Sequence, residues 1–204
     1  MTSAKTLGGA AQAAPRHWNV DGLPEIEGGV LLVLWGSILA WHALWPSRLS
    51  AMAAGILPLL LVALLLVADQ LLLPQLKARV TYPRVGYAQP RVAPYRRAAA
   101  AGLGAVAAAG MAAWIASEGF DGRHLPRALA GMTAVFLAFC ATRFRLPRFF
   151  AYAAVAVVCG LALPREWPVD LGVGVLQAVV GAAAVAGGVR TLRRLLRTPI
   201  AEEP

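Results

Sequence analysis

The sequence predicts an all-α fold, a polytopic transmembrane helical bundle of about six spans with both termini in the cytoplasm. Three observations predict it: an apolar composition, a series of apolar stretches each about one bilayer long, and an uneven distribution of arginine between the connections. Of the 204 residues, 59% are hydrophobic and only 14% are charged, whereas a typical soluble domain is about 25% charged. A bilayer can cover this much apolar surface far more readily than a soluble fold can.

Each expected span is an apolar run between polar or proline-containing connections. Residues 1–20 are small and polar and are expected to form a disordered tail, residues 21–197 form the transmembrane helical domain, and residues 198–204 form a C-terminal tail. The spans are expected at about 28–45, 51–73, 98–117, 125–142, 149–163 and 169–189, and a basic cytoplasmic loop at 74–97. The fourth and fifth spans are close to the lower length limit of about 17 residues, so a short re-entrant pair is the alternative for them.

The basic residues predict the orientation. Of the 19 Lys and Arg residues, all but Arg48, Arg123, Arg127 and Arg165 fall on one side of the expected topology. Cytoplasmic loops carry the excess of Lys and Arg in membrane proteins, so this side and both termini are expected to be cytoplasmic. The bacterial inner membrane is the expected location. The net charge of +9 is explained in the same way, and no nucleic-acid partner is expected.

The segment before the first span has the features of a helix start. Asp21 can cap free N–H groups, Pro24 is tolerated in a first turn, and Glu25 favours the positive end of the helix dipole. Leucine-rich spans one and two are expected to face lipid. The small residues of spans three and six favour close helix packing, either within one chain or across a homodimer.

The polar residues of the cytoplasmic side form a candidate functional or structural cluster, made of Asp21, Glu25, Asp69, Arg79, Tyr82, Arg84 and Tyr87. Arg84 or Arg79 is expected to pair with the acidic residues and to hold the 74–97 loop under the bundle. Asp69 is the one carboxylate inside an apolar run, which makes it a candidate functional residue. The alternative is an interfacial aspartate paired with a loop arginine.

The sequence contains no strong catalytic or metal-binding motif. Cys140 and Cys159 lie in apolar runs at different expected depths and are interpreted as packing residues. The three histidines are scattered, so no metal site, no cofactor and no catalytic residue is predicted. The basic C-terminal segment is interpreted as a site for the headgroups of anionic lipids, with an ordinary determinant of topology as the alternative; its members are Arg190, Arg193, Arg194 and Arg197.

A resemblance to a known family rests on two short segments. The first is Asp21-Gly22-Leu23-Pro24-Glu25, before the first span. The second is Thr81-Tyr82-Pro83-Arg84-Val85-Gly86-Tyr87, after the second span. Together they resemble a set of uncharacterised bacterial multi-pass membrane proteins over about residues 18–90, although Val85 and Ala88 stand where relatives are expected to have Thr and Val. The resemblance implies bacterial origin and membrane residence, and no activity.

Three classes of function remain open at this point. A structural, regulatory or accessory membrane component is ranked first, because no buried catalytic groups are gathered in one place. A small transporter or channel that uses Asp69 is second, and a membrane-embedded enzyme is third. The lipid bilayer is the expected partner, together with a second copy of the chain or another membrane protein.

Overall fold

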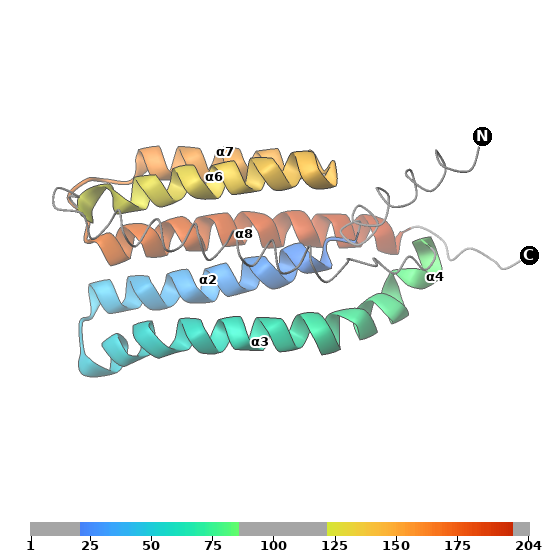
Figure 1. Cartoon of the computed structure of the whole chain (residues 1–204), viewed down its shortest axis with the longest axis horizontal. Helices are drawn as coiled ribbons and strands as arrows, with labels where there is room; N and C mark the ends of the chain where they lie inside the picture. The colour runs from blue at the N-terminus through green and yellow to red at the C-terminus, as the bar shows by residue number, and fades with distance from the viewer. Residues whose placement is uncertain (1–20, 86–121, 198–204) are drawn as a thin grey trace, which may run out of the picture.

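A computed structural model describes residues 21–85 and 122–197, and every regular element in these two ranges is a helix (Figure 1). The elements are α2 (Leu23–Leu44), α3 (Arg48–Val80), α4 (Tyr82–Val85), the 3-10 helix η1 (Gly122–His124), α6 (Leu125–Phe144), α7 (Arg148–Ala162) and α8 (Val169–Leu196). The all-α prediction is therefore confirmed for the described part of the chain. The tails, the expected span at 98–117 and Tyr87 lie outside the described residues.

The long helices lie side by side along one axis, with α8 between α2 on one side and the pair α6 and α7 on the other (Figure 1). Helix α3 packs on α2. The starts of α2 and α7 lie at the same end as the ends of α3, α6 and α8. We call this the basic end, because ten described cations lie at or near it: Lys77, Arg79, Arg84, Arg143, Arg145, Arg148, Arg190, Arg193, Arg194 and Arg197. The opposite end carries Arg48, Arg123, Arg127 and Arg165.

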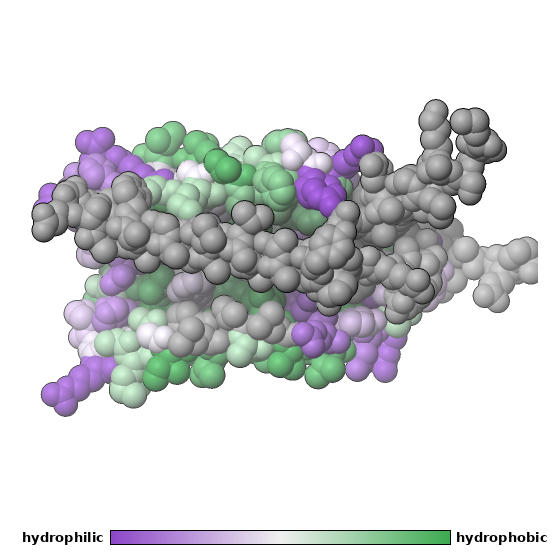
Figure 2. Space-filling view, viewed as in Figure 1, coloured by the Kyte–Doolittle hydropathy of each residue, from purple (hydrophilic) through white to green (hydrophobic). Residues whose placement is uncertain are grey.

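The outer surface between the two ends is apolar. Large hydrophobic side chains are more than half exposed on several helices, among them Leu60, Leu64, Phe136, Phe139, Val158 and Leu161. Figure 2 shows hydrophobic residues in the middle of the molecule and hydrophilic ones gathered towards its ends. Large exposed apolar patches are rare on soluble monomers, so a bilayer is the environment that suits these exposed side chains.

The helix lengths agree with this environment. Helices α2, α6 and α8 are long and apolar enough to cross a membrane, and α7 is a shorter apolar helix of 15 residues. The apolar part of α8, from Val169 to Val189, is about 31 Å long at 1.5 Å per residue, close to the hydrocarbon thickness of about 30 Å.

Helix α3 continues beyond its expected end at residue 73, through Pro74 to Val80, and α4 follows it. The loop expected at 74–97 therefore begins with helix. Pro74 removes one backbone hydrogen bond, but Leu73 just before it and Lys77 and Thr81 after it are spaced by four residues and are all buried. Their burial favours the helical form despite the proline, and α3 curves near this end (Figure 1).

Helices α2 and α8 approach each other through glycines spaced by seven residues. Gly22, the N-cap residue of α2, and Gly29 and Gly36 within α2 face Gly188, Gly181 and Gly174 on the antiparallel α8. We call these six residues the glycine seam. A Cβ atom on Gly29 would lie 2.7 Å from the carbonyl oxygen of Gly181, and one on Gly181 would lie 2.6 Å from that of Gly29. The expectation that span one faces lipid is therefore wrong for this face of α2, because glycine lets two helix backbones touch.

Candidate functional site: a buried polar cluster at the basic end

Asp21 lies at the start of α2 and is completely buried. Its Oδ1 accepts a hydrogen bond from the backbone N–H of Leu23, the first residue of α2, at 3.1 Å. The N-cap position itself is Gly22 and not Asp21, and it has no side-chain capping hydrogen bond. Its Oδ2 accepts hydrogen bonds from Lys77 Nζ at 2.9 Å and from Thr81 Oγ1 at 2.8 Å. Lys77 and Thr81 are one turn apart near the end of α3, so Asp21 joins α3 to the first turn of α2.

Glu25 makes the corresponding connection to α7. Its Oε1 accepts a hydrogen bond from Arg148 Nε at 2.7 Å, and its Oε2 accepts one from Tyr152 Oη at 2.8 Å. Arg148 and Tyr152 are also one helical turn apart, in the first turns of α7. Tyr152 in turn covers Gly187 of α8, where any side chain would collide with the tyrosine hydroxyl.

Gly22, which directly follows Asp21, completes the junction. Gly22 has φ of 76°, in the left-handed region that favours glycine. A Cβ atom at this position would lie 2.5 Å from the carbonyl oxygen of Gly188. The first turn of α2 therefore contacts α3 through Asp21, α7 through Glu25 and α8 through Gly22. We call Asp21, Glu25, Lys77, Thr81, Arg148 and Tyr152 the junction cluster.

One buried and one partly buried ion pair lie at the centre of the junction cluster. Lys77 and Asp21 are 1% and 0% exposed, whereas Arg148 is 24% exposed beside the buried Glu25. Removing one partner of a buried pair strands the other charge, which destabilises a protein by about 3–5 kcal/mol. The cluster can hold helices in register, and each carboxylate already accepts hydrogen bonds from two side chains.

The remaining predicted site residues are placed differently. Asp69 is exposed on α3, and the described part of the chain gives it neither a hydrogen bond nor an ion pair. Arg79 is exposed. Arg84 donates to the carbonyl oxygen of Val80 at 2.8 Å, and Tyr82 is half-buried on α4. The cations that reach the acidic residues are thus Lys77 and Arg148, and not Arg79 or Arg84 as expected.

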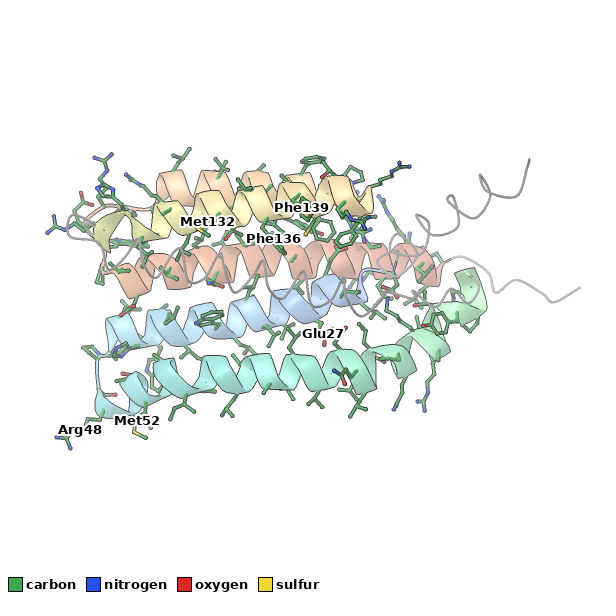
Figure 3. All side chains as sticks on the ribbon, viewed as in Figure 1. Glu27, Arg48, Met52, Met132, Phe136 and Phe139 are labelled. Carbon is green, nitrogen blue, oxygen red and sulfur yellow. The ribbon has the colours of Figure 1, made fainter. Side chains whose placement is uncertain are left out.

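Glu27 is a further carboxylate near the junction cluster. It lies between α2 and α3 (Figure 3), and its Oε1 is buried without a hydrogen-bond partner in the described residues. Asp69 and Lys77 are close enough for their charges to act on it. The described residues contain no group of three or more His, Cys, Asp or Glu side chains that could hold a metal ion.

Sequence reasoning missed Lys77, Thr81, Arg148 and Tyr152 as members of this cluster. A signal for them is present, because Asp21 and Glu25, Lys77 and Thr81, and Arg148 and Tyr152 are each spaced by four residues. On a helix this spacing puts both side chains on one face. Three such polar pairs at the expected cytoplasmic ends of spans are therefore a pattern that could have indicated mutual contact.

Comparison with known proteins adds no relative to this description: no family model, no curated protein and no solved structure matches the chain.

Proposed function

We propose that this chain is a multi-pass protein of the bacterial inner membrane, with both termini in the cytoplasm and a structural, regulatory or accessory role. The apolar outer surface and the three membrane-length helices support membrane residence. The concentration of arginine at the basic end supports a cytoplasmic position for that end. The start of α2 and the end of α8 lie together there, as an even number of crossings requires.

One observation carries the proposed role. The buried charged groups of the described chain, Asp21, Glu25 and Lys77, are engaged in ion pairs that join helices. Groups that act on a substrate or conduct an ion usually face a cavity or a water-filled path inside the bundle. Here the buried charges stabilise a junction that joins helices. Asp69 has an exposed side chain, but it lies one turn before Leu73 on the side of α3 that faces α2, and its charge acts on Glu27 and Lys77. The engagement of the buried charges in ion pairs between helices favours assembly over chemistry.

An accessory role predicts a stable partner. When the tagged chain is cross-linked in intact membranes at its native level and purified in mild detergent, we expect a second membrane protein to accompany it at fixed stoichiometry. A matched control is the same chain carrying Gly28→Ala, at a position where a Cβ atom meets nothing within 4 Å, which should leave the yield of the complex unchanged. Recovery of the chain by itself, from membranes in which it is folded, would contradict the accessory role.

The competing transport function is tested at Asp69. In a chain with Cys140→Ala and Cys159→Ala, we expect an Asp69→Cys variant to react with a membrane-impermeant maleimide from the cytoplasmic face only. Glu166→Cys, at the opposite end, is the control and should react only from the outside. Reaction of position 69 from both faces would instead indicate a water-filled path through the bundle and favour the transporter.

A further inference from the structure

One exposed stripe of α8 changes from apolar to basic along its length. Val179, Ala182, Ala186, Arg190, Arg193 and Arg197 are all exposed, and they follow one another at intervals of three or four residues. This spacing places them on one side of a helix. We call these six residues the outer stripe of α8.

The direction of the outer stripe is fixed by contacts on the other side of the helix. Gly188 is buried against Gly22 of α2, and Leu195 is 8% exposed. Helix α8 is continuous from Val169 to Leu196, so these contacts orient both halves of the stripe together. Arg194 is exposed as well, but its position in the helical repeat lies outside the stripe.

The dimensions of the outer stripe match half a bilayer. Eleven residues separate Val179 from Arg190, and Ala182 from Arg193, so each pair is about 16 Å apart along the axis at 1.5 Å per residue. Half of the hydrocarbon core is about 15 Å thick. A lipid whose phosphate lies at the arginines would therefore run its acyl chains over the apolar half of the stripe towards the middle of the bilayer.

We propose that the outer stripe of α8 is a binding surface for anionic phospholipids of the cytoplasmic leaflet. Arg190, Arg193 and Arg197 contact the negative headgroup, and Val179, Ala182 and Ala186 contact the acyl chains. Free phosphate would use only the basic half. If the basic segment only determined the topology, its arginines would have to lie on the cytoplasmic side, but they would not have to lie on the same side of the helix as the exposed apolar residues. This inference rests on the proposed membrane residence and names the lipid that this surface selects.

The test measures lipid selectivity of the whole chain in mild detergent. The purified protein is titrated with phosphatidylglycerol and with phosphatidylcholine, and bound lipid is counted by native mass spectrometry. The stripe variant carries Arg190→Gln, Arg193→Gln and Arg197→Gln. The matched control carries Arg79→Gln, Arg143→Gln and Arg145→Gln, which removes the same charge from exposed positions at the same end.

We expect the parent protein to prefer phosphatidylglycerol, and the stripe variant to bind it on the order of a hundredfold more weakly, from about fivefold per arginine. The control should lose less than about fivefold in total. Equal losses in both variants, no preference in the parent protein, or complete displacement by inorganic phosphate would each overturn the lipid surface. If the triple variant does not fold, Arg193→Gln alone should still show the loss of about fivefold, and an unchanged affinity would overturn the inference.

Failure of this inference can be told from failure of the proposed function. If the protein is integrated in the membrane but does not select anionic lipid, the lipid surface is wrong and membrane residence stands. If the protein is recovered from cells without surfactant, both are wrong.

Discussion

Replacing Gly29 by alanine is expected to lower the free energy of unfolding by roughly 3 kcal/mol. The added Cβ atom would lie 2.7 Å from the carbonyl oxygen of Gly181 and 2.9 Å from the backbone nitrogen of Val185. Backbone atoms cannot move aside as a flexible side chain can, so α2 and α8 must separate along the glycine seam. Unfolding measured by steric trapping in bicelles, or by thermal melting in mild detergent, will report the loss.

Gly28 provides the matched control for this prediction. It is the neighbouring residue of the same helix, and a Cβ atom there would meet nothing within 4 Å in the described structure. Alanine favours helix over glycine by up to about 1 kcal/mol, so Gly28→Ala should be neutral or slightly stabilising. If Gly28→Ala and Gly29→Ala behaved alike, the close contact between α2 and α8 would be wrong.

Local sequence signals predicted the helices well. The expected spans at 125–142, 149–163 and 169–189 correspond to α6, α7 and the main part of α8. Each is bounded by Pro, Gly or Arg residues beside an apolar run, and such signals depend on near neighbours only. The end of α3 was placed too early because Pro74 is a strong local stop signal, whereas the contacts that overcome it come from residues distant in the sequence.

The glycine seam shows why the packing could not be predicted in the same way. Gly29 and Gly36 lie among leucine, isoleucine and valine residues, so the composition of span one suggested a lipid-facing helix. Their importance comes from the partner glycines on α8, more than 130 positions away in the sequence. The sequence shows a seven-residue repeat of glycine in both segments. Only the antiparallel pairing of α2 and α8 in the structure shows that these glycines contact one another.

The acidic residues of the junction cluster were predicted from the sequence, but their partners were not. Asp21 and Glu25 were expected to meet cations at the basic end, and they do. The choice of Arg79 or Arg84 was wrong because distance along the chain does not determine which side of α3 faces α2. Lys77 and Thr81 share the buried side with Leu73, whereas Arg79 points to solvent.

The ion pair between Asp21 and Lys77 should give the largest single effects in the molecule. Asp21→Asn leaves the ammonium group of Lys77 buried beside a neutral amide. Lys77→Met leaves the Asp21 carboxylate with Thr81 and the backbone of Leu23. Each change is expected to destabilise the protein by about 3 kcal/mol, because a charge in a buried site loses its direct ion-pair partner.

The double variant measures how much of the stability comes from the interaction between Asp21 and Lys77 themselves. With Asp21→Asn and Lys77→Met combined, neither member of the pair remains charged, so we expect part of the stability to return and a coupling free energy of about 1–3 kcal/mol, since replacing a whole buried pair by neutral groups is often tolerated. The return is incomplete because Glu27 loses the nearby charge of Lys77. Glu166→Gln is the control, because this exposed carboxylate at the opposite end of the molecule should change stability by less than about 0.5 kcal/mol. Additive losses in the double variant would mean that Asp21 and Lys77 act independently, and the junction between α2 and α3 would then have to depend on other contacts.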